Sequence, residues 1–323
     1  MEIENMLAKN INTASHKANY DASCKRLLAN KIILAWIMKS CLEEYRDYDV
    51  EQIAQEYIED NPTISKIPVN QDETLSRSEQ ISGSSTEDST ITEGIINYDI
   101  RFFASVPRTK ETIKLILNVE AQNDFYPGYP IIKRSIYYCS RLISAQYGTE
   151  FTDSHYEKIR KVYSIWICIN PPAYRKNTIT RYIIQEENLI GMVSEKKENY
   201  DLMTVIMICL GNSQDDRYTG ILKLLEVLLS SQKEPEEKKI ILQNDFKIKM
   251  TKELESEVSL MCNLSKGVEE RGILIGLEQG RIESILSAIQ NLMDSMDWSA
   301  EQAMRALKIP ESEQSVYSRK LNK

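Results

Sequence analysis

The chain has 323 residues, of which 42% are hydrophobic and 27% charged, and its formal net charge at pH 7 is −8. This composition excludes fibrous and wholly disordered classes and fits one substantial globular domain with attachments. No apolar stretch approaches the roughly 20 residues that cross a bilayer, and the first ten residues lack the pattern of a secretory signal. We therefore expect a cytoplasmic protein without a membrane segment.

The distribution of charge and of cysteines bears on nucleic-acid binding, zinc sites and disulfides. Divided into residues 1–100, 101–200 and 201–323, the chain has more Lys and Arg than Asp and Glu only in the middle part, which permits a local phosphate-binding face. The six cysteines form no C-x-x-C pair and there are only two histidines, which argues against a structural zinc site. We expect the cysteines to be small buried side chains in a reducing compartment, without a disulfide framework.

Hydrophobic spacing predicts the elements of the first half. Residues 21–45 have the apolar spacing of a helix that Asp21 could cap. Residues 70–93 are polar and predict a mobile loop. Alternating apolar residues then predict two strands, 95–106 and 113–122, joined by a polar turn as a hairpin.

The second half continues with helices and buried strands. Helical spacing spans residues 129–147, and an apolar run at 162–170 ends at two prolines, as a buried strand would. Another apolar run at 202–210 precedes a helix at 218–230. This order of helices and strands predicts an α/β sandwich over residues 17–230.

Residues 231–323 are expected to form a separate helical tail. Glycines recur in it at intervals of four or five residues, which lowers local helix stability. Near its end, Trp298 to Gln302 resembles a capped helix start, and a further short helix is expected at 311–320. One apolar stripe of the tail could pack against a second copy, which predicts a homodimer. The stripe consists of Ile273, Leu277, Ile282, Ile285, Leu286, Ile289 and Leu292.

Alternation along the predicted hairpin brings polar side chains together. Asp99 falls on the polar face of the first strand, and Glu120 and Gln122 on the polar face of the second. Two neighbouring carboxylates repel each other unless a proton or cation lies between them, and oxygen ligands favour a hard ion such as Mg²⁺. Such an ion lowers the pKa of a bound water. The competing interpretation is that these side chains face solvent on a half-exposed sheet.

Three segments carry a resemblance to a known family. Asn97-Tyr98-Asp99-Ile100-Arg101-Phe102, Asn118-Val119-Glu120-Ala121-Gln122-Asn123-Asp124 and the helix at 134–146 resemble the PD-(D/E)XK transposase family, related to the recombination-promoting nucleases. The match extends across most of residues 17–230, including the opening helix and the core strand at 166–170. It implies a restriction-endonuclease-like core, a mixed sheet flanked by helices, with an α-helical extension.

The resemblance also implies roles for the polar residues. By this resemblance, Asp99 and Glu120 are the metal-binding carboxylates, and Gln122 occupies the position where the superfamily usually has Lys. Gln cannot supply positive charge, so Lys25 could replace that cation and Asp21, one helical turn away, could complete the metal site. Alternatively, Asp21 is only a helix cap and Lys25 belongs to a solvated pair.

The helix after the hairpin offers a second group. Arg134, Tyr138 and Arg141 share one helical face, where they could bind a DNA phosphate, as a similar helical motif does in the superfamily. The alternative is that the arginines flank a core helix while Tyr138 packs on the sheet.

The function expected from these residues is that of a DNA endonuclease. Mg²⁺ would be its cofactor, Mn²⁺ a substitute, and transposition or recombination its setting. The rival interpretation is a non-catalytic, DNA-binding or self-assembling protein derived from a transposon, with a decayed site. The chain has no P-loop motif and no G-x-S-x-G elbow, so neither a nucleotide cofactor nor serine hydrolase chemistry is expected.

Overall fold

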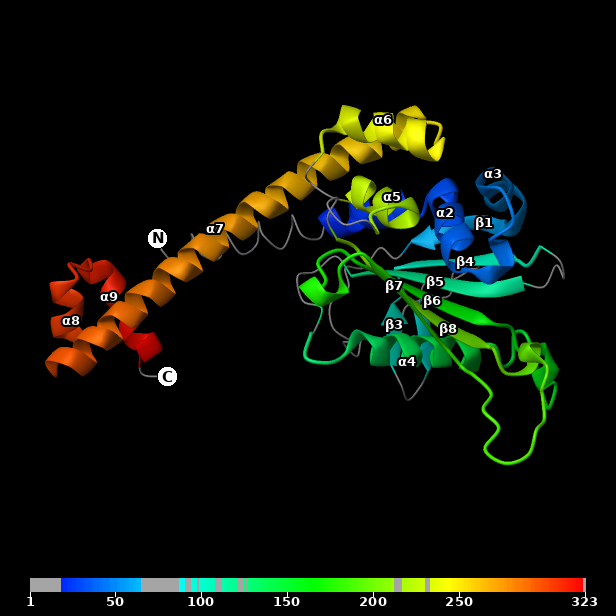
Figure 1. Ribbon diagram of the computed structural model, residues 1–323, viewed down its shortest axis with the longest axis horizontal. Helices are drawn as coiled ribbons and strands as arrows, with labels where there is room; N and C mark the ends of the chain where they lie inside the picture. The colour runs from blue at the N-terminus through cyan, green and yellow to red at the C-terminus, as the bar shows by residue number, and fades with distance from the viewer. Residues whose placement is uncertain are drawn as a thin grey trace. The chain divides into compact units, whose positions relative to one another are not determined.

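The computed structural model describes most of the chain, in two compact units divided between Ser265 and Lys266 (Figure 1). Within the described part, no helix is both long and apolar enough to cross a membrane. The described residues are 19–64, 87–90, 94–97, 99–107, 112–120, 125, 127–211, 217–229 and 233–321.

The predicted helix over 21–45 is in fact broken. Residues 19–28 are helical, and a second helix, α2, spans Lys31–Cys41. The Asn30 side chain accepts a hydrogen bond from the backbone N–H of Ile32 (3.0 Å) and caps α2, so the chain changes direction here. The single long helix was therefore wrong, although both helices bury an apolar face.

Short elements lead from α2 to the first strand and interrupt the later loops. They are the 3₁₀ turn η1 (Glu43–Tyr45), α3 (Val50–Gln52), the π-helical turn η2 (Ile53–Tyr57), and the 3₁₀ turns η3 (Tyr156–Lys158), η4 (Ala173–Arg175) and η5 (Lys197–Asn199).

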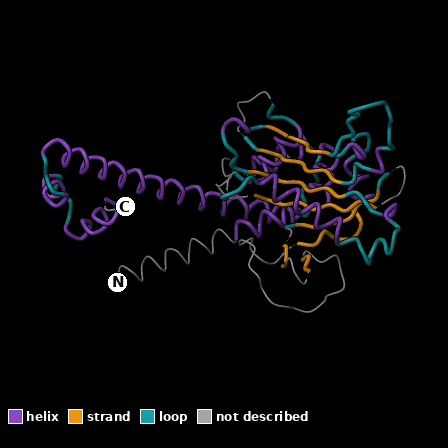
Figure 2. The backbone as a smooth tube through the Cα atoms, turned by 90° about the horizontal axis from the view of Figure 1, so that it is seen from below, coloured by secondary structure: helices purple, strands orange, loops and turns teal. Residues whose placement is uncertain are grey.

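A mixed sheet forms the centre of the first unit, in the order β1-β4-β5-β6-β8-β7 (Figure 2). The neighbours β5, β6 and β8 are parallel, whereas β1 pairs with β4, β4 with β5, and β7 with β8 in antiparallel fashion. The β4–β5 hairpin and the mixed α/β class are thus confirmed. The strands are β1 (Ile58–Ile64), β4 (Ile100–Ser105), β5 (Thr112–Glu120), β6 (Val162–Cys168), β7 (Thr178–Ile183) and β8 (Met203–Cys209).

The predicted strand over 95–106 is divided at Asp99, which lies in a bend. Its first part, β3 (Gly94–Asn97), pairs with β2 (Glu87–Thr90) in a separate two-stranded sheet. Four residues of the segment 70–93, where a mobile loop was expected, thus form a strand, because their backbone pairs with β3. Residues 70–86 and 91–93 lie outside the described part.

Helices cover both faces of the central sheet (Figure 1). Helix α4 (Ile131–Ser144) lies on one face, and helix 19–28, α2 and α5 (Gly220–Leu229) lie on the other. The side chains of β6 therefore alternate between two cores and all seven are buried. Burial on both faces explains why the sequences of β6 and β8 are continuous apolar runs.

The first unit extends beyond the expected boundary at residue 230. Helix α6 (Pro235–Phe246) packs on α5, and the start of α7 (Lys252–Met296) adds Leu254 and Val258 to the same core. These apolar contacts are the physical reason why the boundary lies at Ser265. Five of the six cysteines are buried, as expected.

The second unit is a small helical module with its own core. The predicted capped start is confirmed, because Ser299 and Gln302 form a capping box before α8 (Ala300–Ala306), and α9 (Glu311–Leu321) follows. Part of the tail stripe packs against α8 and α9, and Leu277 is 66% exposed, while the side chain of Ile273 lies outside the described residues. The stripe residues used in this way are Ile282, Ile285, Leu286, Ile289 and Leu292.

Candidate active site at the carboxyl ends of the parallel strands

The ends of several strands meet at one edge of the sheet. Glu120, the last residue of β5, pairs with Cys168 at the end of β6, which pairs with Cys209 at the end of β8. Strand β4 runs the opposite way and begins at this edge, with Ile100 paired to Leu117. The carboxyl ends of parallel strands are the usual position of ligand sites in α/β sheets.

Asp99 lies at this edge, immediately before β4. It is only 3% exposed, and its carboxylate lies 2.8 Å from Lys25 Nζ. Strand alternation predicted that Asp99 faces away from the side of Ile100, but Lys25 belongs to a helix that packs on that same side. Alternation fails here because Asp99 occupies a bend outside the strand.

Lys25 joins Asp99 to Asp21. Its Nζ lies 2.7 Å from a carboxylate oxygen of Asp21, four residues earlier on the same helix. The helix already includes residues 19 and 20, so Asp21 does not cap it and the capping interpretation is wrong. The alternative of a solvated pair is also wrong, because the Lys25 side chain is 2% exposed. The structure thus brings together three of the predicted site residues.

The protonation of Lys25 follows from its two partners. Burial by itself lowers the pKa of Lys25, but the carboxylates of Asp99 and Asp21 outweigh burial, and the pKa is raised above 10.5. Lys25 is therefore an ammonium ion at neutral pH. It leaves the three-residue cluster with one net negative charge.

The cluster offers carboxylate oxygens, the donors that Mg²⁺ prefers. In the structure the oxygens of Asp21 and Asp99 converge on the Lys25 ammonium, which occupies that point. Among the side chains that the structure describes, no three His, Cys, Asp or Glu residues form a metal-binding group. The side chain of Glu120 is not among them, and Gln122 lies outside the described residues altogether.

The residues predicted on α4 take different environments. Tyr138 is 2% exposed and packs against Trp166, as the core interpretation predicted. Arg134 stacks over both rings and donates a hydrogen bond to the Tyr138 hydroxyl (2.7 Å). Arg141 is 3% exposed and donates to the hydroxyl of Tyr137. Arg134 lies over Trp166, which pairs with Asn118, two residues before Glu120 on β5.

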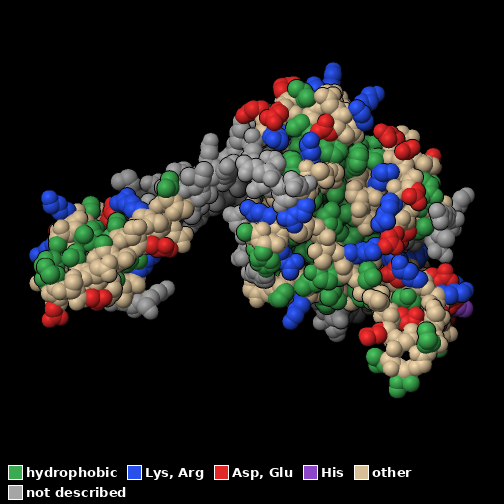
Figure 3. All heavy atoms as spheres, in the orientation of Figure 1, with side chains coloured by type: hydrophobic (Ala, Val, Ile, Leu, Met, Phe, Trp, Pro, Cys, Tyr) green, Lys and Arg blue, Asp and Glu red, His purple; other side chains and the backbone are tan. Residues whose placement is uncertain are grey.

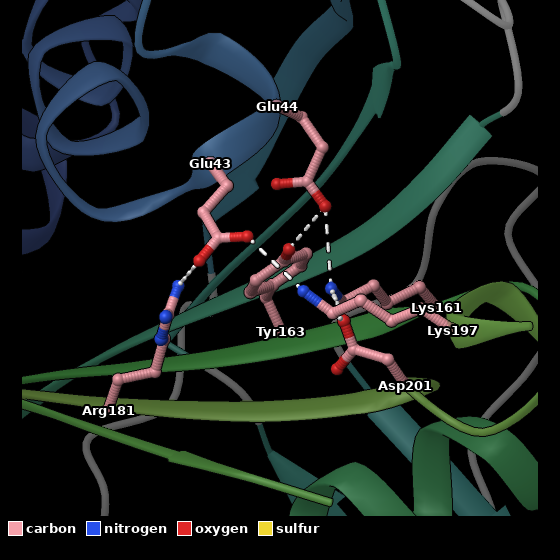
Figure 4. Close-up of polar contacts among 7 residues, drawn as sticks. All are labelled: Glu43, Glu44, Lys161, Tyr163, Arg181, Lys197 and Asp201. Atoms are coloured by element: carbon pink, nitrogen blue, oxygen red, sulfur yellow. Dashed lines mark hydrogen bonds and ion pairs between the residues drawn. The ribbon is translucent and has the colours of Figure 1, made fainter. Parts of the chain in front are cut away.

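A second charged cluster lies at the opposite, amino ends of β6 and β8 (Figure 4). Lys161 Nζ lies 2.7 Å from Asp201 and 3.4 Å from Glu44, and Glu44 also accepts a 2.6 Å hydrogen bond from the Tyr163 hydroxyl. Glu43 binds both Arg181 and Lys197. Three acids face three bases, so this network is neutral and joins η1 to the sheet.

Sequence reasoning did not anticipate this second cluster. Most of its contacts join separate parts of the chain, and only Lys197 and Asp201 show a local signal, the i, i+4 spacing. The first cluster carried a local signal, the i, i+4 spacing of Asp21 and Lys25.

Comparison of the chain with family models, with curated proteins and with solved structures gave no match.

Proposed function

We propose that this chain is a Mg²⁺-dependent DNA endonuclease with a PD-(D/E)XK core. The observation that carries the proposal is the buried contact of Lys25 with Asp99 and Asp21, at the sheet edge where β5 ends in Glu120. The family resemblance of the Asp99 and Glu120 segments adds the reaction type.

Asp99 and Glu120, with Asp21 as a third ligand, would hold the metal ion. The ion, when bound, supplies an activated water and stabilises the charge that develops on the phosphodiester. Asp21 is the most exposed of the described cluster carboxylates, with 21% of its side chain accessible, and it offers an open side to solvent and substrate.

Lys25 acts as a fixed positive charge. Its raised pKa keeps it protonated, so it cannot serve as the general base at neutral pH. An ammonium beside the metal ligands stabilises a negatively charged transition state instead. Lys25 thereby supplies the positive charge that the neutral Gln122 lacks.

DNA phosphates would be bound near the same edge by Arg134. Its guanidinium stacks over Tyr138 and Trp166, and this stacking orients it. Tyr138 and Arg141 are buried and support this arrangement by packing rather than by contact with DNA.

The test is cleavage of supercoiled plasmid with Mg²⁺ or Mn²⁺ by the full chain and by Asp99→Asn and Glu120→Gln. The amide variants keep the shape of each side chain and remove its charge. We expect both to abolish cutting, whereas Lys223→Met, far from the cluster in sequence and partly exposed, should cut normally. Cutting that survives both amide substitutions would refute the assignment.

The alternative is a non-catalytic DNA-binding or self-assembling protein. It is favoured by one observation: Lys25 already neutralises much of the charge of Asp21 and Asp99, as a purely structural ion-pair cluster does. Lys25→Met distinguishes the two functions. If the carboxylates form a cation site, Mg²⁺ will raise the melting temperature of this variant more than that of the native protein. A variant without any Mg²⁺ response, from a parent that cuts no DNA, would favour the alternative.

A further inference from the structure

Strand β7 forms one end of the central sheet. Within the described chain it pairs with β8 alone. Three isoleucines on or next to it are exposed: Ile179 (41%), Ile183 (45%) and Ile184 (43%). An edge strand with exposed apolar side chains is a template for pairing with another strand.

The loop after β7 carries a larger apolar surface. Leu189, Ile190, Met192 and Val193 are 85%, 96%, 97% and 74% exposed. Figure 3 shows hydrophobic side chains at the end of this projecting loop, at the lower right. Such a concentration of exposed apolar side chains marks an interaction site.

The loop tip has a defined conformation. Asn188 donates to the carbonyl oxygen of Val193 (3.0 Å) and accepts from its N–H (2.9 Å), which closes the turn. Gly191 lies in this turn with a φ of 77°, a conformation that glycine adopts without strain. The apolar side chains are thus presented by a closed turn rather than by an extended segment.

The base of the loop is anchored by the cluster of Figure 4. Arg181 on β7 and Lys197 after the loop both bind Glu43, and Lys197 also lies 3.7 Å from Asp201. The two arms of the loop are therefore tied to the same carboxylate. A surface anchored in this way loses little conformational entropy when it binds.

We infer that β7 and its loop bind a second copy of this chain. The interface, here called the β7 edge surface, consists of Ile179, Ile183, Ile184, Leu189, Ile190, Met192 and Val193.

A second copy fits the surface for two reasons. Antiparallel pairing of β7 with itself is compatible with a two-fold axis, the commonest symmetry of dimers. It also brings the exposed Glu187, beyond one end of β7, towards the exposed Lys176 before the other end in the partner copy. Glu186 and Glu187 give this arm of the loop a negative charge, which disfavours binding to DNA or anionic lipid.

The test is sedimentation of the full-length protein over a range of concentrations. The native chain should show a monomer–dimer equilibrium, and Ile190→Asp with Met192→Asp should raise the dimer dissociation constant by about tenfold or more. The matched control is Ile240→Asp on α6, an apolar residue of similar kind that is 56% exposed and lies outside the surface. It should leave the dissociation constant unchanged.

A charge exchange distinguishes loss of the interface from misfolding of a variant. Lys176→Glu and Glu187→Lys should each weaken the dimer, and the double variant should restore it. A protein that stays monomeric at every concentration would overturn the inference, as would a dimer that only Leu277→Asp in the tail dissociates. The readout is molecular mass, so the outcome for the dimer does not depend on whether the protein cleaves DNA.

Discussion

Replacement of Lys25 by Met tests the central cluster most directly. The substitution keeps an unbranched side chain of similar length and removes the ammonium ion from between Asp99 and Asp21. The side chain of Asp99 is 4% exposed, so the substitution leaves a buried carboxyl group without the ammonium ion that contacts it. We expect Lys25→Met to destabilise the protein strongly.

The size of the expected loss of stability follows from the burial of the ion pair rather than from its N–O distance. Removing one partner of a buried ion pair costs about 3–5 kcal/mol, because the other charge stays desolvated. The pair Lys223–Asp245 provides a matched control. Its N–O distance of 2.7 Å equals that of Lys25–Asp21, but its side chains are 32% and 43% exposed. Breaking an exposed pair costs roughly 0–1 kcal/mol, so Lys223→Met should be nearly neutral.

Urea unfolding followed by circular dichroism measures both variants. Adding Asp99→Asn to Lys25→Met should recover part of the lost stability, since position 99 then carries no buried charge. Because the folded-state pKa of Lys25 is raised, its contribution is present below pH 10.5 and is lost as the pH rises through the higher folded value. Equal losses for Lys25→Met and Lys223→Met at pH 7 would refute the reasoning.

Three further predictions concern packing, pH and capping. Tyr138→Phe removes the hydroxyl that accepts the hydrogen bond from Arg134 and should cost about 1 kcal/mol. Tyr138→Ala opens a cavity beside Trp166 and should cost about 3–5 kcal/mol in the same urea assay. Burial lowers the pKa of Lys238, partly opposed by Cys262, so at this group the unfolded chain binds more protons than the folded one. The free energy of unfolding of the native protein, measured relative to that of Lys238→Met, should therefore rise with pH towards 10.5, and a difference independent of pH would contradict this. Ser299→Ala should cost about 1 kcal/mol and speed amide hydrogen exchange in α8, because it removes the capping box, and unaltered exchange there would count against that role.

Local sequence patterns were sufficient to predict several elements. The alternating run of β4 and the continuous apolar run of β6 identified these strands, because burial on one face or on both leaves a direct pattern in the sequence. Ser299 and Gln302 similarly identified the start of α8, since a capping box needs only residues three positions apart.

Other features depended on contacts between distant parts of the chain. The helical spacing over 21–45 is nearly continuous, yet the chain turns at Asn30 so that two helices can cover one sheet face. The bend at Asp99 ends strand alternation, and the packing of α6 and α7 moves the unit boundary to Ser265. Periodicity reports which face is buried but not against which partner.

The candidate site combines both kinds of information. By itself, the sequence determined that Asp21 and Lys25 share a helix face, because four residues make about one helical turn. Only the tertiary structure decided that Asp99 meets Lys25 in a buried position, and that Glu43 joins Arg181 to Lys197 at the other end of the sheet. These ion pairs join residues far apart along the chain, and their partners are set by how apolar faces pack rather than by any local spacing.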